Sequence, residues 1–187
     1  MDDFLKNSSL DDSESQIIRK QIIDLTINYY EKTHLPKKFI PGKTMVPVSG
    51  KVFDEIELQL LISSSLDFWL TSDRFNKKFE KNLSNFLNST FVLTTNSGSS
   101  ANLLAITALK SKELGTRSMN DGDEVITVAA GFPTTVNPII QNDLVPVFID
   151  VKLGTYAIDE TKIENAITKK TKAIMLAHTL GNTFNLT

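Results

Sequence analysis

The hydrophobic pattern of the chain changes at about residue 90. Before that point, apolar residues recur every three or four positions, and this spacing predicts helices at residues 13–30, 53–63 and 75–86. The segment between the first two helices, residues 33–52, is rich in proline and glycine. This composition predicts an extended crossing segment rather than a further helix.

After residue 90, short apolar runs alternate with helical patterns. The runs predict strands at residues 90–95, 124–130, 144–151 and 171–178. Helices are predicted between them at residues 99–110, 134–142 and 159–167. Strands and helices that alternate over short connections are typical of βαβ units and of a mostly parallel sheet buried on both faces. The predicted fold class is therefore α/β.

Composition narrows the functional classes. The 187 residues carry a net charge of −2, which argues against a general binder of nucleic acid or of a membrane surface. The chain has no cysteine, so disulfides and thiolate metal sites are excluded within it. The acidic, polar start is unlike a secretory signal, and no apolar run approaches the roughly 20 residues that span a bilayer. We expect a cytoplasmic protein.

Three known motifs, two for nucleotide binding and one for a catalytic serine, are incomplete in this sequence. A P-loop around Gly42 would need a glycine where Lys37 stands. The Rossmann fingerprint is missing because Gly98 has no second glycine two residues away. A nucleophile elbow needs a glycine on both sides of its serine, and Ser97 and Ser99 lack this pattern.

Residues 96–101 join a predicted strand to a predicted helix, and they contain a glycine and several hydroxyl side chains. Backbone N–H groups at a helix N-terminus are unpaired and carry partial positive charge. Ser99 and Ser100 add hydroxyl donors beside Gly98. A phosphate would fit such a turn. A tight turn with serine caps and no ligand explains the same residues.

Two further side chains follow predicted strands. Phe132 comes after the strand at residues 124–130, at the carboxyl end where open α/β sheets place their ligands, and its flat ring could stack on a flat cofactor. A core phenylalanine beside a helix cap is the alternative. His178 ends the last predicted strand and could face the same carboxyl end of the sheet. A purely structural histidine is the alternative.

Several stretches of the chain resemble the DegT/DnrJ/EryC1/StrS family of sugar aminotransferases and dehydratases, which use pyridoxal 5′-phosphate. They are WLTSDRF, TTNSGSSANLLAI, GDEVITVAAGFPTTVNPII, LVPVFIDV, TYAID and TKAIMLAHTLGN, in the family's order over about residues 40–187. The resemblance implies the fold of PLP-dependent transferases of type I, which is aspartate-aminotransferase-like. Residues 1–52 would form an N-terminal helix and extended segment, and residues 53–187 the N-terminal part of the PLP-binding large domain.

The resemblance also implies roles for the candidate residues. In such proteins the glycine–hydroxyl turn holds the cofactor phosphate, which implies this role for Gly98 and Ser99, with Ser100 as a helper. The aromatic residue after the next strand stacks on the pyridine ring, which implies that role for Phe132. His178 lies in the family's His-x-x-Gly segment near the cofactor.

One branch of the family is especially similar. The N-terminal helix and the stretch KKFIPGKTMVPVSGKVFDE resemble the CDP-4-dehydro-6-deoxyglucose 3-dehydratases, enzymes of lipopolysaccharide synthesis on the route to 3,6-dideoxyhexoses. This implies a CDP-sugar substrate, pyridoxamine 5′-phosphate as the working cofactor, and a histidine in place of the Schiff-base lysine. Lys43 and Arg74 are weaker candidates for binding a sugar-nucleotide diphosphate, and a plain surface charge is the favoured explanation for both.

The branch also implies partners and missing parts. Many of its members bind a [2Fe–2S] cluster that an iron–sulfur flavin reductase serves, and family members work as homodimers. The catalytic residues and any cluster cysteines are expected downstream of Thr187, so we expect an N-terminal fragment that is inactive by itself. A sugar-nucleotide aminotransferase and a non-catalytic truncated protein remain as alternatives, and a Rossmann-type module is disfavoured by its missing glycines.

Overall fold

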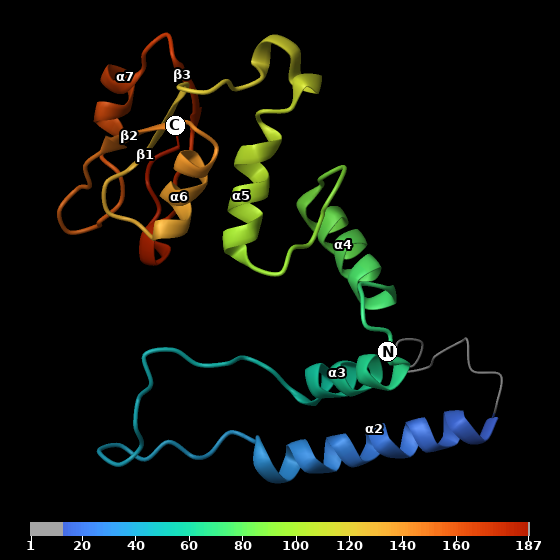
Figure 1. The fold of residues 1–187 in the computed structure, drawn as a ribbon. Helices are drawn as coiled ribbons and strands as arrows, with labels where there is room; N and C mark the ends of the chain where they lie inside the picture. The colour runs from blue at the N-terminus through green and yellow to red at the C-terminus, as the bar shows by residue number, and fades with distance from the viewer. Residues whose placement is uncertain (1–12, 187) are drawn as a thin grey trace. The chain divides into compact units, whose positions relative to one another are not determined.

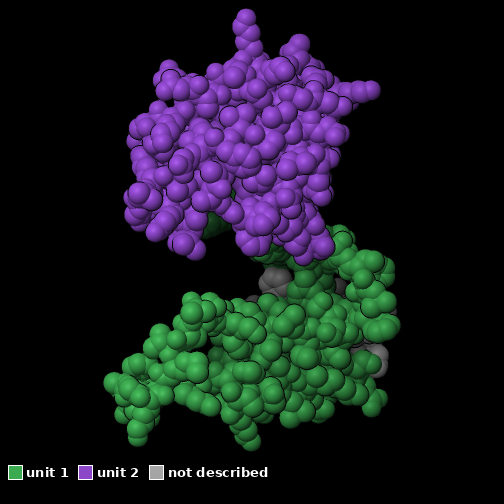
Figure 2. All heavy atoms as spheres, turned by 60° about the vertical axis from the view of Figure 1, so that its left-hand side comes forward, with its two compact units in different colours: residues 1–92 green, residues 93–187 purple. Residues whose placement is uncertain are grey.

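The computed structural model describes residues 13–186 of the chain. The chain forms two compact units, unit 1 (Met1–Val92, green in Figure 2) and unit 2 (Leu93–Thr187, purple in Figure 2). This division falls at a different point from the domain boundary predicted at residues 52 and 53, which stays a prediction. In the described part, no helix is both long and apolar enough to cross a membrane.

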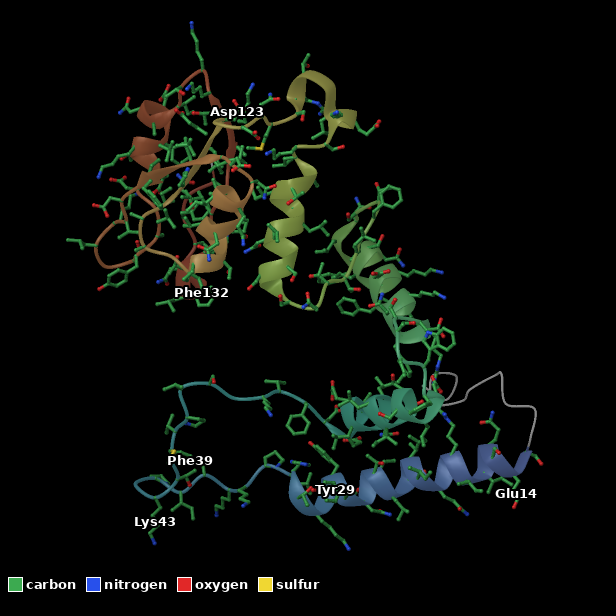
Figure 3. All side chains as sticks on the ribbon, viewed as in Figure 1. Glu14, Tyr29, Phe39, Lys43, Asp123 and Phe132 are labelled. Carbon is green, nitrogen blue, oxygen red and sulfur yellow. The ribbon has the colours of Figure 1, made fainter. Side chains whose placement is uncertain are left out.

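Unit 1 contains the three predicted helices. They are α2 (Ser13–Thr33), α3 (Glu55–Asp67) and α4 (Arg74–Leu87). Helices α2 and α3 lie side by side (Figure 1), and the long connection between them leaves and returns at one aromatic cluster. In this cluster the ring of Phe53 lies 5.9 Å from Tyr30 and 5.4 Å from His34, centroid to centroid. Figure 3 shows Phe39 and Lys43 on the connection itself.

A charge network joins helices α2, α3 and α4 of unit 1. Nη2 of Arg19 lies 2.9 Å from Oδ1 of Asp67, and Nε of Arg74 lies 2.8 Å from Oδ2 of the same carboxylate. Arg19 is only 5% exposed and also donates to Ser63. Asp67 therefore links a side chain of α2 with the first residue of α4.

Helix α4 has the strongly amphipathic pattern that the sequence predicts, but its apolar stripe is only partly covered. Among the residues that the structure describes, α4 contributes none to the buried core. Phe86 is 85% exposed and Phe79 is 55% exposed. The spacing thus predicts the helix correctly, but none of its side chains is fully buried in the structure.

Helix α3 begins at a capping box. The carboxylate of Asp54 accepts a hydrogen bond from the N–H of Ile56, and the N–H of Asp54 donates to Oε2 of Glu57 at 2.7 Å. The hydrogen bond from the backbone of Asp54 is the main reason that the pKa of Glu57 lies below its ordinary value of 4.5. The reciprocal bonds satisfy two donors that a helix start leaves unpaired.

This capping box predicts a pH effect on stability. Because the folded-state pKa of Glu57 is lowered, its contribution is present above the unfolded-state value near 4.5 and is lost as the pH falls through the folded value. Glu57→Gln keeps a capping acceptor but cannot titrate. We expect the melting temperature of this variant to fall less than that of the wild type between about pH 5 and about pH 3. Equal falls of the melting temperature in the two proteins over this pH range would contradict the prediction.

Unit 2 is built on a parallel sheet with the strand order β2-β1-β3. The strands are β1 (Glu124–Val128), β2 (Val145–Ile149) and β3 (Thr171–Ile174). Both neighbours pair with β1 in parallel, which confirms the predicted βαβ arrangement. Since all three strands run the same way, their carboxyl ends meet at one edge of the sheet.

Helices cover both faces of this sheet (Figure 1). On one face lie α5 (Gly98–Ala108) and α6 (Pro133–Gln141), whose Ile106 and Ile139 pack with Val125 of β1. On the other face lies α7 (Ile163–Ala166), against the cluster that contains Ile126. The near-complete burial of β1 follows from its central position.

Two predicted elements differ from the structure. Residues 90–95 form no strand, because a strand needs a hydrogen-bonded partner and none of the described strands pairs with them. The helix predicted at residues 159–167 divides into a 3-10 turn, Glu160–Lys162, and the single turn α7. Apolar spacing alone reveals neither the partner of a strand nor the pitch of so short a helix.

Candidate functional site

The first candidate feature is the N-terminus of α5. Ser97 is the N-cap, and its hydroxyl accepts a hydrogen bond from the N–H of Ser100 at 3.2 Å. The hydroxyls of Ser97 and Ser100 are also 3.2 Å apart. The cap therefore uses the N–H of Ser100, whereas the N–H groups of Gly98 and Ser99 precede the first intrahelical bond and remain directed out of the helix.

The space beside Gly98 is open. A Cβ atom built on this residue would have no neighbour within 4 Å, and the backbone of Gly98 does not have a positive φ. Neither packing nor backbone strain within the described chain therefore requires glycine here. Close approach of a bound group to the backbone is a use of glycine that this geometry permits.

The second feature is the N-terminus of α6, which follows β1. Pro133 is the first helical residue, and Phe132 is the N-cap residue in extended conformation. Figure 3 shows Phe132 at this end of α6, and the side chain is 71% exposed. Phe132 thus lies at the carboxyl end of the sheet as predicted, but it is not a core residue.

The two helix starts lie next to each other. Helices α5 and α6 pack side by side on one face of the sheet (Figure 1), and Nδ2 of Asn102 donates to the carbonyl oxygen of Thr134 at 3.1 Å. This bond joins the second turn of α5 to the first turn of α6. Two positive helix ends therefore converge beside Gly98 and Phe132, and such an arrangement favours an anion.

Asn102 was not among the predicted site residues. The sequence contains one sign of it, since Pro138 stands four residues after Thr134 inside a predicted helix. A proline has no N–H, so the carbonyl four residues earlier needs another donor. The sequence does not say which residue supplies that donor.

His178 follows β3 at the same edge of the sheet. Its imidazole ring packs on Phe184, with 4.3 Å between the ring centroids and an angle of 32° between the planes. The next residues form the 3-10 turn Thr179–Gly181, and the amide of Asn182 donates to the carbonyl of Thr155 at 2.9 Å. The imidazole of His178 is exposed, so it is accessible from solvent.

A buried polar atom lies close to the same edge. Within residues 13–186, the hydroxyl of Thr127 is fully buried and has no hydrogen-bond partner. Thr127 is two residues from Val125 on β1 and therefore shares the face that α5 and α6 cover. An unpaired buried hydroxyl costs free energy in the folded protein.

The arrangement in unit 2 fits a phosphorylated, flat molecule. Outward amides at Gly98 and Ser99 suit a phosphate, and an exposed ring at Phe132 suits an aromatic system. The other two candidates belong to unit 1. The guanidinium of Arg74 is bound to Asp67 and lies 4.2 Å from the ring centre of Phe75, while Lys43 lies in the turn after Ile40.

Comparisons with known proteins agree on one family. The model of the DegT/DnrJ/EryC1/StrS aminotransferase family matches residues 53–187. The lipopolysaccharide biosynthesis protein RfbH of Salmonella typhimurium is 60% identical over 169 residues, which cover 90% of this chain and 39% of that protein. The dTDP-4-dehydro-2,6-dideoxy-D-glucose 3-dehydratase of Saccharopolyspora spinosa is 44% identical over 88% of this chain and 36% of that protein.

A solved structure supports the same relationship. The GDP-4-keto-6-deoxy-D-mannose-3-dehydratase of Escherichia coli, solved with bound hydrated PLP, superposes with a TM-score of 0.62 at 33% identity. The match covers 68% of this chain and 32% of that chain. The chain thus spans less than half the length of the proteins that it resembles.

Proposed function

The chain belongs to the DegT/DnrJ/EryC1/StrS aminotransferase family, and from this premise we propose that it carries the phosphate-binding part of a cofactor site for pyridoxal or pyridoxamine 5′-phosphate. The whole protein would be a CDP-4-dehydro-6-deoxyglucose 3-dehydratase of lipopolysaccharide O-antigen synthesis. The observation that carries the proposal is the convergence of the α5 and α6 N-termini at the carboxyl edge of the sheet, beside the exposed ring of Phe132.

Each candidate residue has a defined part in this proposal. The N–H groups of Gly98 and Ser99 and the hydroxyl of Ser99 would bind the phosphate. Ser100 contributes indirectly, because its N–H and hydroxyl are bound to Ser97 and hold the turn. Phe132 would stack on the pyridine ring, and His178 would lie at the margin of the site.

The cofactor, when bound, supplies the electron sink that breaking a C–O bond beside a ketone requires. This chain's own residues bind and orient it. The helix ends fix the phosphate, and the ring of Phe132 restricts the tilt of the pyridine plane. This chain has no cysteine, so it supplies no thiolate ligand for a [2Fe–2S] cluster. The cluster, its reductase partner, the homodimer and the cytoplasmic location are therefore proposed for the whole protein only.

Relatives support the dehydratase branch over the aminotransferase branch. The protein at 60% identity is named for lipopolysaccharide biosynthesis, and the one at 44% identity is named a sugar 3-dehydratase. An aminotransferase remains the second candidate because the family as a whole is named for that activity. The truncated, non-catalytic alternative would retain cofactor binding only.

One experiment separates these functions. The full gene product, loaded with pyridoxamine 5′-phosphate, is incubated with CDP-4-dehydro-6-deoxyglucose in heavy-oxygen water. Reversible loss of the C3 hydroxyl would place heavy oxygen at C3, which supports the dehydratase. Conversion to a 4-amino sugar that depends on an added amino donor would support the aminotransferase. Cofactor binding without either change would support the non-catalytic protein.

The role proposed for Phe132 predicts a selective loss of affinity. Phe132→Ala should weaken the binding of pyridoxal 5′-phosphate about tenfold, because aromatic stacking contributes roughly 1 kcal/mol beyond buried area. The folded protein should be little affected, since the ring is largely exposed. Affinity is measured by absorbance titration, and stability by thermal melting.

Phe148 provides the matched control. It is also an exposed phenylalanine of unit 2, at 53% exposure, but it lies within β2 rather than after β1. Phe148→Ala should leave the affinity for pyridoxal 5′-phosphate unchanged. Equal affinities of the two variants would remove Phe132 from the site.

A further inference from the structure

The carbonyl of Thr134 has an unusual position in α6. In an α-helix this oxygen accepts a hydrogen bond from the N–H four residues later. That residue is Pro138, which lies inside α6 and has no N–H. The proline ring also crowds the carbonyl four residues before it, which turns this oxygen away from the helix axis.

Asn102 supplies the missing donor from the neighbouring helix. Its Nδ2 atom is 3.1 Å from the oxygen of Thr134, across a separation of 32 residues, and the contact is partly buried. A partly buried carbonyl without a donor costs free energy, so the amide of Asn102 and the proline complement each other. This is a link between helices that neither helix could form alone.

The position of the link connects it to the candidate site. Asn102 lies about one turn after Gly98 in α5, and Thr134 lies two residues after Phe132. The hydrogen bond therefore fixes the first turn of α6 relative to the N-terminal half of α5. A shift of one helix start against the other would change the distance between the outward amides and the ring of Phe132.

We propose that Asn102 is a positioning residue of this site, and that Pro138 makes it one by leaving the Thr134 carbonyl for Asn102 to bind. The pair sets the spacing between the phosphate-binding turn at Gly98–Ser99 and the ring of Phe132. Asn102 itself touches no cofactor atom in this role. The inference rests on the proposed function, since it assigns the link to the cofactor site.

A double-mutant cycle in the full gene product tests the proposal. Asn102→Ala should weaken the binding of pyridoxal 5′-phosphate about tenfold, which corresponds to the loss of one good hydrogen bond. Pro138→Ala restores an N–H that can reach the carbonyl of Thr134 within α6. In the Pro138→Ala background, Asn102→Ala should therefore cost less than about threefold in affinity.

Asn142 gives a matched control. Asn142 is the C-cap residue of α6, and its Nδ2 atom donates to the carbonyl of Pro138 at 2.8 Å, at the end of the helix away from Phe132. Asn142→Ala should lower the melting temperature at least as much as Asn102→Ala, because Asn142 is buried. It should leave the affinity for pyridoxal 5′-phosphate unchanged.

The outcomes separate this inference from the proposed function. If the wild type binds pyridoxal 5′-phosphate and Asn102→Ala binds it equally well, the positioning role is wrong and the proposed function stands. Equal losses of affinity from Asn102→Ala with and without Pro138→Ala would also overturn it, since the proline would then play no part. If the wild type does not bind pyridoxal 5′-phosphate at all, the proposed function fails and the positioning role fails with it.

Discussion

Replacing Ser99 by aspartate is expected to weaken the binding of pyridoxal 5′-phosphate by about 100-fold without destabilising the protein. Ser99 is exposed in the first turn of α5, with its N–H and hydroxyl at the proposed phosphate position. A carboxylate there would lie beside the phosphate. Two like charges about 4 Å apart repel by about 4 kcal/mol at an effective dielectric constant of about 20.

Salt and the exposed position reduce this repulsion, so we expect about 2.7 kcal/mol, or two orders of magnitude in affinity. Stability should move in the opposite direction. An acidic side chain in the first turn of a helix is favourable by roughly 0.3–1 kcal/mol. A variant that melts no lower than the wild type but loses the cofactor would assign the loss to the site.

Ser111→Asp is the matched control for Ser99→Asp. Ser111 lies beyond the other end of α5, where its hydroxyl caps the 3-10 turn Lys112–Arg117 by accepting from the N–H of Glu113. Aspartate can keep this cap and adds the same charge. If Ser111→Asp weakened binding as much as Ser99→Asp, the effect would be one of net charge, and the phosphate would not be bound at the start of α5.

Local pattern was sufficient to predict most of unit 2. The strand at residues 124–130 was predicted from its continuous apolar run, and β1 (Glu124–Val128) is indeed buried on both faces. The helix after Gly98 was predicted from a hydroxyl-rich turn followed by helical spacing, and α5 begins there. Both signals lie within about ten residues of sequence, which is why they could be recognised without the structure.

Long-range partners could not be predicted in this way. Residues 90–95 have the apolar composition of a strand, but pairing depends on residues elsewhere, and no described strand provides it. The link from Asn102 to Thr134 spans 32 residues, and the one from Arg19 to Asp67 spans 48. A helical pattern identifies which positions face inward, but it does not identify the polar group that each one meets.

The charge network in unit 1 should have the largest effect on stability. Asp67→Ala is expected to lower the free energy of unfolding by about 3 kcal/mol. This carboxylate accepts hydrogen bonds from two arginines, Arg19 at 2.9 Å and Arg74 at 2.8 Å, and Asp67 is only 12% exposed. Both guanidinium groups also donate to the hydroxyl of Ser63, and the substitution removes the carboxylate that offsets their charge.

Helix α2 should loosen first in the Asp67→Ala variant, because Arg19 loses one of the hydrogen bonds that join α2 to α3. Hydrogen exchange of α2 amides would therefore accelerate more than that of β1 amides, which lie in unit 2. Chemical denaturation gives the overall change in free energy. Asp67→Asn tests the charge separately, since it keeps the shape of the side chain and can still accept hydrogen bonds from the arginines.

Asp73→Ala is the control for Asp67→Ala, because it removes an ion pair that is exposed rather than buried. Asp73 pairs with Lys77 at 2.9 Å within α4's first turn, but the lysine is 75% exposed and the pair lies at the surface. The hydrogen bond from Lys77 lowers the pKa of Asp73, yet solvent screens such a pair, so its loss should leave the denaturation midpoint almost unchanged. If both variants lost the same stability, burial would not be what makes Asp67 important, and the network would not be what fastens α2 to α3.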